Sequence, residues 1–255
     1  LVVNQNKRRA IEANHTATHL LHYALRKVLG SHVEQKGSYV NDQRLRFDFS
    51  HPSKLTEEEV RQVEKLVNSM IREDYHIEDF REIDIKQAQA MGAMALFGEK
   101  YGDKVRCVRF GESIELCGGT HASSTGRIGM ISIVNETAVA AGVRRIEAIT
   151  GRAVYNYLKE KEQVIADVCA NLKTKEDSLS QRVTSLLEEN KNLSKELHEV
   201  KTKMSLQSID SVLDSKVDIN GVSLVTTKFS GMDMNTLKDV ADKLRDKLVS
   251  GVVVL

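Results

Sequence analysis

The sequence contains little that would tie it to a membrane, to a disulfide framework or to a large charged partner. It has no tryptophan, one proline and three cysteines in 255 residues, and its formal net charge is +1. Three irregularly spaced cysteines do not make a disulfide framework, and they fit a reducing, cytoplasmic compartment. No run of 18 apolar residues predicts a membrane span, and no signal peptide is visible.

Near-neutral charge leaves any contact with nucleic acid to local basic patches. The candidates are the run Lys7-Arg8-Arg9, the pair Arg44 and Arg46, and the pair Arg144 and Arg145. Each of these, taken alone, is more often a solvated face than a binding surface.

Three parts with different compositions follow one another along the chain. Residues 1–150 mix helical and strand patterns, residues 151–214 form one long helical segment, and residues 215–255 begin a small α/β domain. We therefore expect an α+β protein whose first domain combines helices with antiparallel sheet. The chain opens on Leu-Val-Val and closes on an apolar run, Val252–Leu255, which reads as a strand. We expect it to be a fragment of a longer protein.

Local signals place the elements of the first part. Apolar residues at helical spacing before Gly30 predict a helix over 7–29. Thr56 and Glu59 form a capping-box pattern for a helix that runs to about Arg72. Alternation around the turn Asn41-Asp42 predicts a hairpin over 38–49. Further strands are expected at 76–84, 104–110, 113–117, 130–135 and 143–149, with a short helix at 85–95.

Residues 152–214 contain no glycine or proline and carry a heptad pattern. Positions d are Leu179, Leu186, Leu193 and Val200, and positions a are Val183, Asn190, Leu197 and Met204. This spacing predicts a coiled-coil seam in which an amide at an a position can fix the register. The partner is a second chain or a returning helix, or else the helix lies on its own domain. Beyond it we expect a hairpin over 216–229 around Asn220-Gly221, a helix at 234–249 and the terminal strand.

Two pairs of possible metal ligands stand about a hundred residues apart. His15 and His19 are four residues apart and so share one face of the predicted helix. Cys117 and His121 flank two glycines, which allow a tight turn and let the thiolate and imidazole converge. Each pair alone is weak evidence for a metal site, but together the two pairs form a set of nitrogen and sulfur ligands that suits Zn²⁺. A metalloprotease helix would carry glutamate directly after the first histidine, where this chain has Thr16.

Several longer segments carry a resemblance to a known family. They are Asn14–His22, Gln35–Ser38, Leu45–Phe49, Gly92–Tyr101, Cys117–His121 and Ala141–Glu147. Together they closely resemble the editing domain of alanyl-tRNA synthetases, and the rest of the chain resembles the helical segment and C-terminal domain that follow it there. The editing domain of threonyl-tRNA synthetases shares the two metal-type pairs. The downstream heptads and the stretch Gly142–Arg145 favour the alanyl enzyme.

The resemblance implies a hydrolase that cleaves the ester of tRNA(Ala) mischarged with serine or glycine. It implies a Zn²⁺ site at His15, His19, Cys117 and His121, with Gln35 and Thr18 at positions tied to editing. The family ligates alanine to tRNA(Ala) with ATP, but the domain for that step would lie upstream. A homodimer through the heptad segment or the C-terminal domain is a further expectation. Whether zinc organises the pocket or activates water stays open, because four ligands would close the site whereas three would leave a position for water.

Less specific interpretations compete at several of these residues. Thr18 could bond to the helix carbonyl four residues earlier, and Gln35 could be a surface amide. Asp48 and Arg46 could face the cleft, although a cross-strand ion pair is the commoner arrangement. We expect His22 to be packed or exposed rather than a ligand, and Cys107 and Cys169 to be buried small apolar residues. The alternative function is a zinc-stabilised tRNA-binding or dimerisation module without chemistry of its own.

Overall fold

The computed structural model describes residues 2–94, 101–214, 217–220, 222–228 and 234–247. The chain divides into two compact units, Leu1–Val164 and Ile165–Leu255. Helices combine with sheets in which all strand pairs are antiparallel. The predicted α+β class is therefore confirmed. The proposed boundaries at 150 and 214 remain predictions.

A four-stranded antiparallel sheet forms one side of the first unit, in the order β1-β2-β7-β6. Its strands are β1 (Gln35–Val40), β2 (Leu45–Ser50), β6 (Ile131–Ala140) and β7 (Val143–Thr150). The predicted hairpin is present, and Asn41 closes its turn by accepting the N–H groups of Gln43 and Arg44. The strand expected at 130–135 continues to Ala140, because it pairs with β7 as far as the turn at Gly142.

Two helices cover one face of this sheet. Helix α1 (Gln5–Leu29) is capped at its start by the Asn4 side chain and ends at Gly30, whose φ of 119° suits glycine. Helix α2 (Glu57–Arg72) begins with the predicted capping box, in which Thr56 and Glu59 exchange hydrogen bonds. The core between helices and sheet includes fully buried Leu20, Leu21, Val63, Phe47, Phe49 and Ile146. Burial of these apolar side chains holds α1 in one orientation against the sheet.

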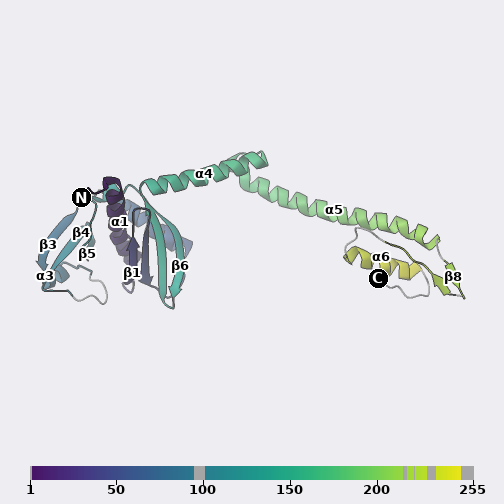
Figure 1. The fold of residues 1–255 in the computed structure, drawn as a ribbon, viewed down its shortest axis with the longest axis horizontal. Helices are drawn as coiled ribbons and strands as arrows, with labels where there is room; N and C mark the ends of the chain where they lie inside the picture. The colour runs from purple at the N-terminus through teal and green to yellow at the C-terminus, as the bar shows by residue number, and fades with distance from the viewer. Residues whose placement is uncertain (1, 95–100, 215–216, 221, 229–233, 248–255) are drawn as a thin grey trace. The chain divides into compact units, whose positions relative to one another are not determined.

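A second sheet lies on the other side of α1 (Figure 1). It contains β3 (Glu78–Asp84), β4 (Lys104–Phe110) and β5 (Ser113–Leu116), with α3 (Ile85–Ala90) after β3 and η1 (Thr125–Ile128) following the sheet in the chain. The Ser113 hydroxyl donates to the His19 carbonyl and links β5 to α1. Helix α3 ends earlier than predicted, at Ala90, and residues 95–100 of the Gly92–Tyr101 motif lie outside the described residues.

The long helical segment expected over 151–214 consists of two helices. Helix α4 (Arg152–Leu172) ends where Lys173 takes a φ of 50°, and the turn η2 (Glu176–Ser178) precedes α5 (Leu179–Asp214). The residue that ends a helix in the left-handed backbone conformation is usually glycine. A lysine in that role gives no such signal in the sequence.

The heptad seam of α5 faces solvent along much of its length. Leu193, Leu197, Val200 and Met204 are exposed by 64%, 56%, 52% and 66%, and Asn190 is exposed as well. None of these side chains is buried by the described residues of its unit. The pattern therefore still calls for a partner, and a coiled coil with a second chain stays a prediction.

Among its described residues, the second unit also contains a small two-stranded sheet and helix α6. Strands β8 (Val217–Ile219) and β9 (Val222–Leu224) form the hairpin expected around Asn220, whose φ is 54°. Helix α6 (Met234–Lys247) buries Val240 and Leu244 and contacts α5. The strand predicted at Val252–Leu255 lies outside the described residues.

Candidate metal centre

Helix α1 presents His15 and His19 toward the three-stranded sheet. They are one turn apart, with His19 buried and His15 partly buried. Their rings lie 5.2 Å apart between centroids in an edge-to-face arrangement. The ring of His121 stacks on His15 at 4.2 Å and lies 4.5 Å from His19. Three imidazoles from two distant segments therefore meet at one point.

Cys117 completes the cluster from the loop directly after β5. Its Sγ lies 3.5 Å from His15 Nε2 and 3.3 Å from His121 Nε2. One ligand atom from each of His15, His19, Cys117 and His121 lies within 4.8 Å of all the others. Tetrahedral Zn²⁺ with bonds of about 2.0–2.3 Å needs donors roughly 3.5 Å apart. The donor set and its spacing therefore fit a metal ion.

Hydrogen bonds from neighbouring residues fix the loop that carries Cys117 and His121. The Thr120 carbonyl lies 3.1 Å from His15 Nδ1. The Thr16 hydroxyl accepts the Ala122 N–H and lies 3.2 Å from His121 Nδ1. Partners of this kind orient ligand histidines and select their tautomer. Thr16, which replaces the protease glutamate, thus supports the loop.

Electrostatics keeps the imidazoles neutral, which is the form that binds metal. Burial is the main cause that lowers the pKa of His15, and the positive charge of Arg106 adds to it. Burial also holds the pKa of His19 well below its usual value, with the other histidines adding to the effect. Burial and the neighbouring His15 lower the pKa of His121 to about 3. All three rings are uncharged near neutral pH.

The two glycines of the loop have a different role from the one expected. Neither Gly118 nor Gly119 has a positive φ. Instead, Gly119 lies against the His15 ring, and a Cβ at this position would lie 2.7 Å from His15 Nδ1 and closer still to Cε1. A Cβ on Gly118 would meet nothing within 4 Å. Gly119 is therefore required for space around His15, rather than for an unusual backbone conformation.

Two residues that the sequence reasoning missed support the cluster. Glu115 is buried on β5, with Oε1 2.9 Å from His22 Nδ1 and Oε2 3.5 Å from His19 Nε2. Arg106 on β4 donates to the Cys117 and Gly119 carbonyls and is itself held by Asp79. Neither residue belongs to a recognisable spacing, because both reach the site only through sheet pairing. His22 is packed against Glu115 and is not one of the four donors.

Replacing Arg106 by glutamine is expected to weaken metal binding by about 10–100-fold, the usual cost of losing a residue that orients ligands. The Cys117–His121 loop would lose the donor that fixes two of its carbonyls, whereas all four ligands would remain. Competition with a chromogenic chelator measures the affinity. Replacing Arg109, which bonds to Gly111 at the far end of β4, is the matched control. Unchanged metal affinity in the Arg106 variant would show that the Cys117–His121 loop keeps its conformation without the Arg106 hydrogen bonds.

Thr18 and Gln35 are held by contacts within their own elements. The buried Thr18 hydroxyl donates to the Asn14 carbonyl at 2.8 Å, which is the competing arrangement considered above. Gln35 opens β1 opposite Phe49, and its amide donates to Ser38 Oγ at 3.2 Å. The structure brings the four proposed ligands together, and none of the hydrogen bonds found among the described residues joins Gln35 or Thr18 to them. Their roles stay predictions.

The remaining candidates have structural partners. Asp48 binds Arg145 across β2 and β7 with two bonds of 2.6 and 2.8 Å, and Arg46 lies 3.7 Å from the same carboxylate. The ion-pair interpretation is therefore confirmed. Cys107 is buried as expected, whereas Cys169 is only partly buried.

Comparison with known proteins agrees with this architecture. Residues 105–147, from β4 to β7, match the family model described as "Threonyl and Alanyl tRNA synthetase second additional domain". This part of the chain, which carries Cys117 and His121, is thus similar to a domain of threonyl- and alanyl-tRNA synthetases. No helix among the described residues is both long and apolar enough to cross a membrane.

Whole-chain comparison narrows the class to one enzyme family. The chain is 59% identical over its whole length to the alanine–tRNA ligase of Clostridioides difficile. It is 51% and 48% identical, over 99% of its length, to those of Acetivibrio thermocellus and Porphyromonas gingivalis. It spans about 29% of the length of each relative. The chain belongs to the alanine–tRNA ligase family as a segment of such an enzyme, and the resemblance in its motifs is confirmed.

Proposed function

We propose that this chain hydrolyses the ester bond of tRNA(Ala) mischarged with serine or glycine. The observation that carries the proposal is the convergence of three neutral imidazoles and one thiol between α1 and the β5 loop, in a chain of the alanine–tRNA ligase family. Ligation of alanine to tRNA(Ala) belongs, on this proposal, to the longer enzyme. Its tRNA partner would place it in the cytoplasm.

The physical reason for a second, hydrolytic site is the weak discrimination available to an alanine pocket. Such a pocket cannot exclude glycine by size, and it rejects an added hydroxyl only modestly. A site that acts on the wrong product after tRNA charging adds a second selection step. Editing of this kind requires recognition of both the tRNA and the attached amino acid.

We propose Zn²⁺ as the ion that His15, His19, Cys117 and His121 hold. When bound, it would supply positive charge at the place where, on this proposal, the tRNA terminus is cleaved. Four protein donors close a tetrahedral site, which is the pattern of a structural ion. The ion therefore organises the pocket on this proposal, and side chains of the protein orient the water and the ester.

Thr18 and Gln35 are the proposed side chains for these tasks. The Thr18 hydroxyl donates its hydrogen bond to the Asn14 carbonyl, so toward any other group its oxygen can only accept. It would accept from the serine hydroxyl, which alanine lacks. The Gln35 amide has both donor and acceptor atoms, and it would orient the attacking water or the ester carbonyl.

The decisive experiment measures release of serine from Ser-tRNA(Ala) by the whole chain, with Ala-tRNA(Ala) as the substrate control. We expect selective release of serine. A folded, metal-loaded chain that binds tRNA(Ala) yet releases no serine would refute the proposal.

Replacing Gln35 by alanine is expected to lower the rate of serine release about 100-fold, because one preoriented polar group in a reaction site contributes about this much. Metal content should stay at the wild-type level, since Gln35 is not among the donors. Replacing exposed Gln43 in the same hairpin is the matched control. A Gln35 variant that retains full activity would remove this residue from the mechanism.

A module without catalysis is the second candidate, and two observations favour it. The donor set is complete without water, and the α5 seam is exposed for a partner. On this alternative, the metal only stabilises the fold. Serine release that disappears in a metal-loaded Gln35 variant would exclude it.

A further inference from the structure

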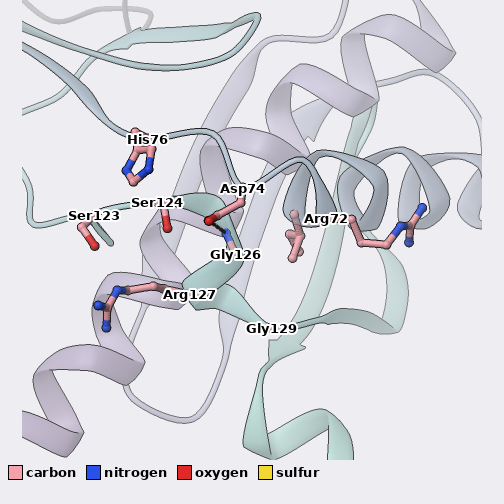
Figure 2. A pocket seen from close by; sticks show the side chains of 9 residues that line it. Arg72, Asp74, His76, Ser123, Ser124, Gly126, Arg127 and Gly129 are labelled. Atoms are coloured by element: carbon pink, nitrogen blue, oxygen red, sulfur yellow. Dashed lines mark hydrogen bonds between the residues drawn. The ribbon is translucent and has the colours of Figure 1, made fainter.

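A groove of about 640 Å³ lies beside the loop that carries His121. One wall is the end of α2 and the following turn, with Arg72, Asp74 and His76, and the other is the stretch from Ser123 to Gly129 (Figure 2). Ser123 is only two residues from His121, so the groove and the metal cluster share one loop. Nothing in the metal chemistry uses this groove.

Hydrogen bonds join the two walls of the groove, so the groove is already formed before a ligand binds. The Thr125 hydroxyl donates to the Met70 carbonyl at 2.7 Å and accepts the Tyr75 N–H at 2.9 Å. The Gly126 N–H donates to Asp74 at 2.9 Å, a contact visible in Figure 2. A Cβ on Gly126 would press on this carboxylate. A preformed site loses little conformational entropy when it binds a ligand.

The groove contains two arginines whose positive charge the protein offsets only in part. Arg72 and Arg127 are exposed, and among the described residues neither guanidinium has an ion-pair or side-chain hydrogen-bond partner. The one carboxylate in the lining, Asp74, offsets one of these two charges. Hydrogen bonds from Ser124 and from the Gly126 N–H, with a smaller contribution from the charge of Arg127, hold its pKa below the usual value, so it is ionised near neutral pH.

Two of the three basic patches singled out in the sequence are paired with carboxylates. Arg44 and Arg46 contact Glu147 and Asp48, and Arg144 and Arg145 contact Glu136 and Asp48. Their charge is largely compensated within the sheet. Arg72 and Arg127 are therefore better placed to bind an external anion.

We propose that this groove binds the ribose–phosphate backbone of a nucleic-acid strand, that of the tRNA substrate, through Arg72 and Arg127. Figure 2 shows the two side chains projecting on opposite sides of the Asp74–Gly126 contact, which suits two phosphates of one strand rather than a single phosphate. His76 and the exposed Ser123 hydroxyl supply further donors. The identification of the bound strand as tRNA rests on the proposed function. The proposal adds to that function the surface that would contact the tRNA.

The test compares binding of uncharged tRNA(Ala) by the whole chain and by the double variant Arg72→Gln/Arg127→Gln at several salt concentrations. We expect the dissociation constant to rise about tenfold for each arginine, because a charged hydrogen bond contributes about 1.5 kcal/mol or more. The dependence of log affinity on log salt should become shallower by roughly 0.7 for each lost phosphate contact. Serine release at saturating tRNA should keep its rate, so the change appears in KM rather than kcat.

The matched control is Arg61→Gln/Lys65→Gln, which removes two charges from the exposed surface of α2 outside the groove. Equal effects of both double variants, or none from the Arg72/Arg127 pair, would overturn the assignment. Inorganic phosphate binding as tightly as the tRNA would also overturn it, in favour of a single-phosphate site. A wild-type chain that binds tRNA through these arginines but releases no serine would refute the proposed function alone.

Discussion

Replacing Cys117 by alanine is expected to abolish retention of Zn²⁺ after dialysis and to lower the melting temperature of the chain. Cys117 Sγ lies within 3.5 Å of two of the three proposed ligand imidazoles, so its loss removes one of the four donors that surround the proposed metal position. A ligand present at 100 times its dissociation constant stabilises a fold by about 2.7 kcal/mol. The variant should lose roughly this contribution, together with serine release. Metal analysis and thermal unfolding measure the two effects.

Cys169→Ala is the control for Cys117→Ala, because it removes a partly buried thiol from α4 at a distance from the cluster along the chain. It should keep both the metal and the melting temperature. A Cys117 variant that binds one Zn²⁺ with wild-type affinity would show that the thiolate is not a ligand. Adding a chelator to the wild type should reproduce the stability loss of the variant, since both remove the same ion.

Gly119→Ala is expected to weaken metal binding by at least 10–100-fold, although it changes no ligand. The added Cβ would collide with the His15 ring, 2.7 Å from Nδ1. Either the ring or the loop must move, and both carry proposed ligands. Displaced or poorly oriented ligands lose affinity on this scale. Chelator competition measures the affinity, and circular dichroism checks that the helices persist.

Gly118→Ala is a closely matched control, since the neighbouring glycine has open space around its Cβ position and no positive φ. The same substitution one residue earlier should leave the affinity near the wild-type value. Equal losses in both variants would indicate a general requirement for loop flexibility. Equal retention would mean that His15 does not occupy the position against Gly119.

The sequence by itself determined most of the local structure and the identity of the candidate ligands. The capping box at Thr56 and the turn at Asn41 depend on contacts between near neighbours, so their residues predict them directly. The two ligand pairs were visible for the same reason, because each lies within five residues. The family was recognisable from the longer motifs that contain these pairs.

Local sequence patterns failed to predict a helix end where a residue other than glycine adopts the left-handed conformation. Lys173 ends α4 with a left-handed conformation that glycine normally supplies, so the break before α5 left little trace in composition. The heptads lie on α5, and the coiled-coil seam that they predict is exposed there. They could not name its partner, because a seam specifies only that another apolar surface must cover it.

Only the tertiary structure decided which distant groups meet and which charges stay free. Arg106 and Glu115 support the cluster from two strands of one sheet, and Gly119 makes room for a ring about a hundred residues earlier in the chain. Arg144 and Arg145 looked free in the sequence but are paired, whereas Arg72 and Arg127 face an open groove. Caps and turns depend on residues that are neighbours in the chain, so the sequence predicts them. The environment of a charged side chain depends on how distant elements pack together, and the sequence does not show which elements become neighbours.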